Sequence, residues 1–323
     1  MNYRRLGRTA LQVSEIGHGL WGMGGWSGSS DEASLQALRT SADLGCNFFD
    51  TAWAYGEGKS DRLLGELLRE NRNRRLYAAS KIPPKNGKWP ATSQDRLEDA
   101  FPTDHVLRHT ELILEALGTD SIDLLQFHVW DDSWAGQEAW MKVVRDLKEQ
   151  GLIRAFGISL NRWEPANGIR ALRTGLVDTV QVIYNIFDQA PEDELFPVCA
   201  ELDIGVIARV PLDEGSLGGQ LTQETTFPAG DWRAGYFGPE NLPPTVERVE
   251  ALKHVTPVSM TLPEMALRFT LSNPQVHTTI VGMRMLEHVR QNLGVSDGKA
   301  LAPDLRATLR KHRWERKLAP WSD

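Results

Sequence analysis

Short apolar segments rich in β-branched residues alternate along the chain with longer segments in which apolar positions recur at helical spacing. The first pattern is typical of buried strands and the second of amphipathic helices. The expected strands are 15–20, 46–50, 75–81, 121–129, 153–159, 179–185, 203–210 and 277–282. The expected helices are 29–45, the run after Lys59, 104–118, 137–151 and 286–293. A serine cap begins the first helix and Gly45 stops it, and Gly118 ends the helix 104–118.

Strands that alternate with helices imply parallel pairing through right-handed crossovers. Eight such units in 323 residues favour a closed barrel over an open sheet. Residues 3–17 alternate apolar and polar positions around Gly7, which predicts an N-terminal β-hairpin. We therefore expect an α/β protein with one domain over residues 1–323. It is a (β/α)8 TIM barrel with long catalytic-face loops after the third, fourth and seventh strands.

Composition narrows the classes of function. The chain is 41% hydrophobic and 24% charged, with a net charge of −7 and a pI near 5.7. No long Lys/Arg run indicates nucleic-acid binding, and no apolar run reaches the length of a membrane span. Cys46 and Cys199 are too few for a disulfide framework or a cysteine-based metal site, and both are expected to be reduced. These features predict a soluble, cytoplasmic protein without a metal, and they leave its oligomeric state open.

Four ionisable residues fall where expected strands end, and the ends of barrel strands carry the chemistry in this architecture. Asp50 ends the second strand, Tyr55 follows it, Lys81 ends the third, and His128 lies at the end of the fourth. Each has a structural alternative on its own: a turn cap, a packed aromatic, a surface charge and a buried structural histidine. Their common topological position favours one catalytic group.

Together these residues predict a proton donor. A free phenol titrates near pH ~10, and an adjacent ammonium lowers that pKa by stabilising the phenolate. A carboxylate holds the ammonium in place, and a neutral imidazole can donate a hydrogen bond to a carbonyl oxygen. This chemistry suits the proton transfer that accompanies hydride transfer to a carbonyl group.

The motifs around these residues resemble the aldo-keto reductase family. "FFDTAWAYG" carries Asp50 and Tyr55, "AASK" carries Lys81, and "IDLLQFH" carries His128, in the order of the family's tetrad. The resemblance runs from residue 3 to residue 293. It implies a barrel that reduces an aldehyde or ketone with NADPH, NADH being less expected, and with Tyr55 as general acid. An alternative is an NADPH-binding, redox-sensing regulatory subunit with slow turnover.

The resemblance also implies a set of cofactor contacts. Leu20, Trp21 and Asp50 would lie at the nicotinamide end, and Ser159 and Gln181 would hold the carboxamide. The residue after Ser159 is usually asparagine, but here it is Leu160, and Asn161 follows. Whether Asn161 reaches the carboxamide stays open, as do structural roles for Ser159 and Gln181.

The segment "ARVPLDEGSLGG" resembles the family's loop around the pyrophosphate, with matches at Pro211, Leu212, Ser216 and Leu217. Arg209 stands where many members have an aromatic residue. Its guanidinium could stack on the nicotinamide or pair with Asp213 or Glu214.

The segment "IVGMRMLEHVRQN" opens the last barrel helix, a position that suits phosphate binding. Gly282 and Arg284 match positions near the ribose 2′-phosphate, although Arg284 could also be a surface charge. Gln291 and Asn292 match adenine contacts, and His288 stands where many members have Gln or Arg.

Aromatic residues concentrate near the expected catalytic loops and predict an apolar substrate pocket. The candidates are Trp21, Trp53, Trp89, Trp130, Trp232 and Tyr236. Any of them could instead be buried structure.

Overall fold

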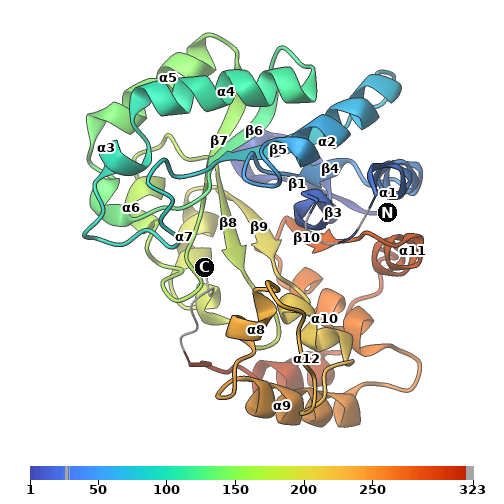
Figure 1. Cartoon of the computed structure of the whole chain (residues 1–323). Coiled ribbons are helices and arrows are strands. Elements are labelled where there is room, and N and C mark those ends of the chain that lie inside the picture. The colour runs from blue at the N-terminus through green and yellow to red at the C-terminus, as the bar shows by residue number, and fades with distance from the viewer. Residues whose placement is uncertain (26–27, 29, 318–323) are drawn as a thin grey trace.

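Eight parallel strands close into a barrel in the structure, a computed structural model that describes residues 1–25, 28 and 30–317 (Figure 1). In order around the barrel, the strands are β10 (Thr278–Gly282), β3 (Ile16–Gly19), β4 (Phe48–Asp50), β5 (Tyr77–Ile82), β6 (Ile122–Phe127), β7 (Ile153–Ser159), β8 (Thr179–Ile183) and β9 (Gly205–Arg209). Each expected strand corresponds to one of these, so the predicted (β/α)8 barrel is confirmed. Several strands are shorter than expected. For example, β4 begins only at Phe48. The side chain of Asn47, just before it, accepts a hydrogen bond from the backbone of Ser14.

Helices cover the outside of the barrel. Those that follow the barrel strands are α1 (Asp31–Asp43), α2 (Lys59–Glu70), α4 (Thr103–Leu117), α5 (Glu138–Glu149), α6 (Ile169–Leu172), α7 (Leu195–Glu201), α10 (Leu262–Leu271) and α11 (Leu286–Gly294). The others are α3 (Leu97–Ala100), α8 (Arg233–Tyr236), α9 (Leu242–Val255) and α12 (Pro303–Arg310). The Ser30 side chain accepts a hydrogen bond from the backbone of Ala33, and Gly118 has a left-handed conformation at the end of α4. Gly45, with a φ of 93°, follows the end of α1, so all three predicted helix signals are confirmed.

An N-terminal hairpin closes the bottom of the barrel. β1 (Tyr3–Arg5) pairs with β2 (Gln12–Ser14) in antiparallel register, as the alternation predicted. Leu6, Leu11 and Val13 are buried among the inward-facing apolar residues of the strands. The hairpin thus fills the end of the barrel where the strands begin, and the opposite end is left for the loops.

The longest loop on that opposite face follows β9. It contains the 3-10 turn η5 (Asp213–Gly218) and α8 before α9 begins. In the view of Figure 1, α9, α10 and α12 gather at the lower end of the molecule, and α4 and α5 lie at the upper end. The loop after β5 runs to α3, and the loop after β6 contains the turn η3 (Asp132–Trp134). No helix among the described residues is long and apolar enough to cross a membrane.

Candidate active site

A buried ion pair between Asp50 and Lys81 forms the centre of the site. Nζ of Lys81 donates to Oδ2 of Asp50 at 2.6 Å and to the carbonyl oxygen of Thr51 at 2.8 Å. The side chains of Lys81 and Asp50 are 0% and 2% exposed. Burial lowers the pKa of Lys81, but the nearby Asp50 and Tyr55 raise it, and the net pKa lies above the ordinary lysine value. Lys81 is therefore a cation at neutral pH.

The phenol of Tyr55 lies next to this cation. Nζ of Lys81 is 5.2 Å from the centroid of the Tyr55 ring. Burial raises the pKa of Tyr55 and Lys81 lowers it, and the net pKa is above its ordinary value of 10. The sequence predicted only the lowering effect, because strand positions do not show how much water the folded barrel removes from the phenol. The net direction is therefore opposite to the predicted one, and the phenol is protonated at neutral pH as a free phenol is.

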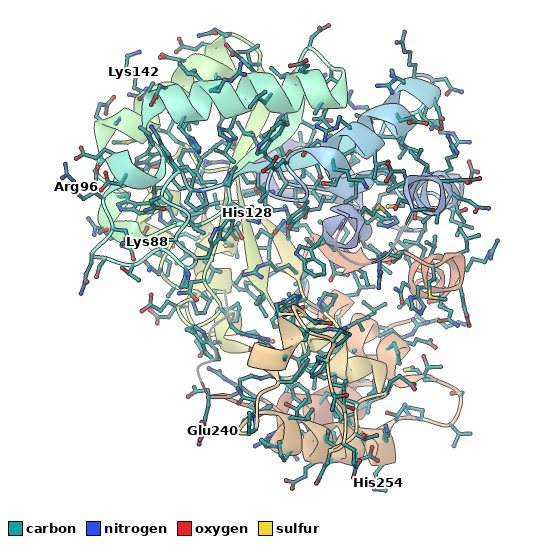
Figure 2. The ribbon with its side chains drawn as sticks, viewed as in Figure 1. Lys88, Arg96, His128, Lys142, Glu240 and His254 are labelled. Atoms are coloured by element: carbon teal, nitrogen blue, oxygen red, sulfur yellow. The ribbon has the colours of Figure 1, made fainter. Side chains whose placement is uncertain are left out.

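The imidazole of His128 completes the group, just after β6 (Figure 2). Its ring centroid lies 5.6 Å from that of Tyr55 and 4.5 Å from that of Trp89. Burial lowers the pKa of His128 well below 6.5, and the positive charges of Lys81 and Arg209 lower it further. Nδ1 has no hydrogen-bond partner among the described residues. His128 is therefore a neutral imidazole with an unused polar atom.

Two neighbours contribute to this group in ways that the sequence did not indicate. Nε2 of Gln181 on β8 donates to Oδ1 of Asp50 at 2.7 Å, from across the barrel. Arg209 donates to the carbonyl oxygen of Leu160 at 3.2 Å and lowers the pKa of both Tyr55 and His128. An inward-facing polar residue within a barrel strand is the signal that could have pointed to the role of Gln181.

The predicted nicotinamide contacts lie around this centre. Ser159 and Gln181 are register partners on β7 and β8, so their side chains leave the same side of the sheet. Leu20 is fully buried and Trp21 is 43% exposed at the mouth. Oδ1 of Asn161 accepts a hydrogen bond from the backbone of Trp163. The side-chain oxygen of Asn161 is therefore already used within its own loop. Whether the Asn161 side chain contacts a carboxamide stays a prediction.

The loop after β9 turns several of its predicted side chains inward. The hydroxyl of Ser216 donates to Asp213, and Leu217 is fully buried. Pro211 is also buried. For these residues, only the backbone can face a ligand on the open side. The Asp213 carboxylate accepts hydrogen bonds from Arg162 and Arg316, whereas Nη2 of Arg209 donates to the carbonyl oxygen of Leu160.

The predicted 2′-phosphate and adenine residues lie around the start of α11. Gly282, Arg284 and His288 are exposed, and Asn292 is 8% exposed. The Arg284 side chain crosses the turn η2 (Trp21–Met23), where a Cβ on Gly22 would lie 2.8 Å from Cδ of Arg284. Gln291 donates to Glu287 at 3.0 Å. Arg284 thus connects the end of β3 with the end of β10.

The aromatic residues of the predicted pocket separate into two groups. Trp21 packs edge-on against Trp232, with centroids 6.0 Å apart, and Trp89 contacts His128, so these three lie at the mouth. The pocket assignment is wrong for Trp53, whose ring contacts His109 of α4 on the outside of the barrel.

Tyr236 and Trp130 also differ from the prediction. Tyr236 is fully buried and its hydroxyl donates to Asp213, so it does not line a pocket. Trp130 is 1% exposed within an aromatic cluster and donates from Nε1 to Asp132. It only borders a small cavity of about 20 Å³ beside His128. A buried phenol or indole usually hydrogen-bonds a polar partner, so both residues have a structural role here.

The chain resembles known proteins in sequence and in fold. The Aldo/keto reductase family model matches residues 15–313. The chain belongs to this family. "Aldo-keto reductase YhdN" of Bacillus subtilis is 31% identical over 72% of this chain and 69% of its own length. The aldo-keto reductases are oxidoreductases. Among the residues that the structure describes, no group of three His, Cys, Asp or Glu side chains could hold a metal ion.

Two further relatives differ in the cofactor that their names give. The "NADH-specific methylglyoxal reductase" of Escherichia coli is 27% identical, over 89% of this chain and 91% of its own length. An aldo-keto reductase from Klebsiella pneumoniae, solved in complex with NADPH, superposes with a TM-score of 0.71 at 23% identity, over 98% of this chain and 97% of its own. The similarity to the Klebsiella structure shows that the two chains share a fold.

Proposed function

We propose that this aldo-keto reductase reduces an aldehyde or ketone to an alcohol with NADPH, with Tyr55 as the general acid. The observation that carries the proposal is geometric: the phenol of Tyr55 lies beside the buried Lys81–Asp50 ion pair and the imidazole of His128 at one barrel mouth. Few other reactions need this combination, because a nucleophile, a metal or a second carboxylate would be the expected partner for hydrolysis or isomerisation.

The residues at the mouth fit a nicotinamide dinucleotide. Ser159 and Gln181 offer adjacent polar side chains, and Arg284 offers a cation beside an exposed helix start. A Cβ added to Gly215, Gly218 or Gly282 would meet no atom within 4 Å, so the backbone there is open to a ligand. The NADPH complex of the Klebsiella relative supports this cofactor, and the NADH-specific relative makes Arg284 the residue to test.

Bound NADPH would supply the hydride to the carbonyl carbon. Tyr55 donates its proton to the carbonyl oxygen as negative charge develops there. Lys81 stabilises the phenolate that remains, and Asp50 keeps Lys81 charged and in place. The neutral imidazole of His128 donates a hydrogen bond to the same oxygen.

The substrate pocket proposed here is smaller than the sequence indicated. Trp21, Trp89 and Trp232 supply aromatic walls at the mouth. Such walls suit a substrate with an apolar body attached to the carbonyl group. We further propose that residues 1–323 act as a single domain, which the span of the family match supports, and that the protein works in the cytoplasm.

The decisive experiment is Tyr55→Phe. Removing one oxygen abolishes proton donation, so turnover should fall by about 10²–10⁴-fold for every aldehyde offered. NADPH affinity, measured by quenching of tryptophan fluorescence, should change little. If the variant keeps more than about a tenth of wild-type turnover, Tyr55 only lines the pocket and is not the general acid. Steady wild-type turnover would also exclude the regulatory alternative.

A further inference from the structure

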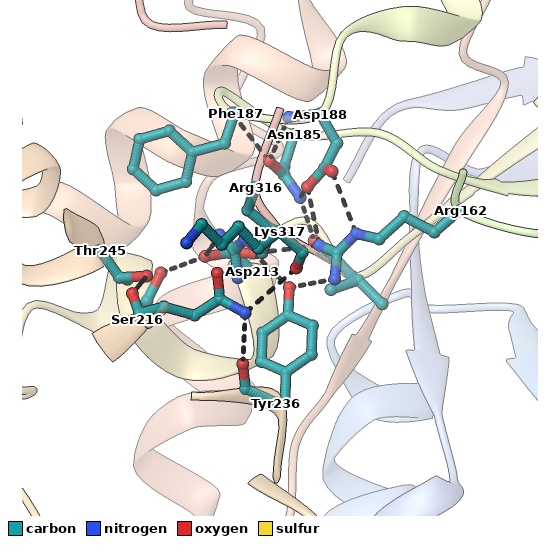
Figure 3. Close-up of polar contacts among 12 residues, drawn as sticks. Arg162, Asn185, Phe187, Asp188, Asp213, Ser216, Tyr236, Thr245, Arg316 and Lys317 are labelled. Atoms are coloured by element: carbon teal, nitrogen blue, oxygen red, sulfur yellow. Dashed lines mark hydrogen bonds and ion pairs between the residues drawn. The ribbon is translucent and has the colours of Figure 1, made fainter. Parts of the chain in front are cut away.

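A buried cluster of charges includes residues of the loop that follows β9 (Figure 3). Nη2 of Arg162 donates to Asp188 at 2.8 Å and to Asp213 at 3.1 Å. Nη2 of Arg316 donates to Asp213 at 2.8 Å, and the hydroxyl of Tyr236 donates to it at 3.0 Å. Asp213 is 0% exposed, and the arginine side chains are 2% exposed. Two arginines thus bind the buried Asp213, and Asp188, whose side chain is 15% exposed, pairs with one of them.

The loop that follows β9 has an unusual backbone. Val210, Asp213 and Glu214 have φ values of 57°, 47° and 54°. These residues are not glycine, so the left-handed conformation is strained and persists only when surrounding contacts impose it. The hydrogen bonds to the Asp213 carboxylate are such contacts, because they fix the residue in the middle of the strained stretch.

Arg316 comes from the segment that follows α12, far from Asp213 in the sequence. The backbone of Trp314 in this segment donates to the carbonyl oxygen of Phe187 at 3.0 Å. The Trp314 ring lies between the guanidinium groups of Arg248 and Arg316, 4.5 and 4.7 Å from its centroid. The side chain of Asn241 donates to the carbonyl oxygen of Lys317 at 3.1 Å. The segment 311–317 is therefore docked, and Arg316 is its link to the loop.

We propose that Arg316 is a positioning residue for the dinucleotide. By binding Asp213 it holds the stretch 211–217 in its strained form, in which the backbone is open at Gly215 and offers that surface to the pyrophosphate. Docking of the segment 311–317 and binding of NADPH are then thermodynamically linked, so that each favours the other. This inference rests on the proposed function, because it takes the loop after β9 as part of the cofactor site.

The first test compares two arginines of the same segment. Arg313 pairs with Asp193 on the surface, at 2.6 Å and 37% exposure, and does not reach the loop. Arg316→Met should raise the Kd for NADPH by about tenfold, within the usual range of such couplings. Turnover at saturating NADPH should stay within about threefold of wild type, because in this coupling the loss falls on cofactor affinity. Arg313→Met should bind NADPH as wild type does. Arg316→Lys should recover part of the affinity, because it restores the charge but not the planar guanidinium.

A second test uses only the wild-type protein, so it holds even if Arg316→Met does not fold. Trypsin should cleave within 311–317 about tenfold more slowly when NADPH is saturating, because the linkage is reciprocal. Cleavage after Arg72 or Arg74, in the exposed turn between α2 and β5 at the opposite end of the barrel, should slow much less. Equal protection at both places would overturn the coupling.

The outcomes separate this inference from the proposed function. Wild-type protein that binds and oxidises NADPH, with equal affinities in Arg316→Met and Arg313→Met, refutes the role of Arg316 and leaves the function standing. Wild-type protein that does not bind NADPH refutes both.

Discussion

The Asp50→Asn variant tests how the buried cation at the centre of the site is maintained. An asparagine has the shape of aspartate but carries no charge. Its oxygen can accept from Lys81, and its amide group can face Gln181 if the Gln181 amide rotates so that Oε1 points toward it. The substitution therefore removes the charge of the counterion and keeps a complete set of hydrogen bonds. What changes is the environment of the Lys81 ammonium, which is 0% exposed.

The magnitude follows from two limits. Removing one partner of a buried ion pair typically costs about 3–5 kcal/mol. The loss of stability in the variant has an upper limit, because Lys81 can become neutral instead of staying charged without a counterion. Releasing its proton costs about 1.36 kcal/mol for each pH unit below the ordinary lysine pKa of about 10.4. The upper limit is about 4.6 kcal/mol at pH 7 and about 1.2 kcal/mol at pH 9.5. In the wild type the pKa of Lys81 is raised, so the wild-type pair stays ionised at both pH values.

We therefore expect Asp50→Asn to lower the free energy of unfolding by about 3–4.6 kcal/mol at pH 7 and by no more than about 1.2 kcal/mol at pH 9.5. Urea unfolding at the two pH values, with Tyr55→Phe as a matched control that keeps the ion pair, measures the difference. Turnover should fall at both pH values, because a neutral Lys81 cannot stabilise the phenolate. A loss of stability that is equal at pH 7 and pH 9.5 would mean that the cost is one of packing and not of charge.

Three further predictions concern single residues. Arg284→Ala should weaken NADPH binding by tenfold or more, consistent with about 1.5–3 kcal/mol for a charge-assisted contact, and leave NADH nearly unaffected; equal losses for both would refute the 2′-phosphate assignment. Arg209→Met should tighten NADP⁺ relative to NADPH, since a cation near the nicotinamide disfavours the cationic ring, and an unchanged ratio of the two Kd values would place the guanidinium elsewhere. Burial raises the pKa of Asp61 to about 6, and its Oδ2 has no hydrogen-bond partner among the described residues; its contribution to stability is complete below pH ~4 and is lost as the pH rises through 6. Asp61→Asn should therefore raise Tm at pH 8 and not at pH 4, and the same increase at both pH values would contradict the assignment.

The sequence predicted those parts of the structure that depend on local pattern. Asp50, Lys81 and His128 could be placed because a residue at the end of a parallel strand has a known position in any barrel. Gln181 was placed on the correct strand, but its bond to Asp50 spans the barrel and depends on the closure of all eight strands. Tyr55 was correctly put beside Lys81, whereas the direction of its pKa shift depends on burial, which no single motif determines.

Loop side chains were predicted less well, for a physical reason. The direction of an aromatic ring in a loop depends on which polar partner its tip finds, and neither period nor composition shows that partner. Tyr236 finds Asp213 inside the protein, and Trp53 turns toward α4. The contact between Arg316 and Asp213 joins residues 103 positions apart. Such a contact becomes visible only after the chain has folded.

The hairpin below the barrel has a consequence for the dielectric surroundings of the catalytic residues. Gly7 has a φ of 50°, and a Cβ at this position would lie 2.2 Å from the backbone nitrogen of Gly205. The hairpin therefore fits against the start of β9 with no room for a side chain. A substitution such as Gly7→Ala would push the hairpin away from the strands and let water reach the packed barrel interior that it covers. The ion pair would then lie in a more polar medium and attract the phenolate of Tyr55 less strongly. Residues at the closed end of the barrel, which never meet a substrate, thus help to set the acidity of the group that does.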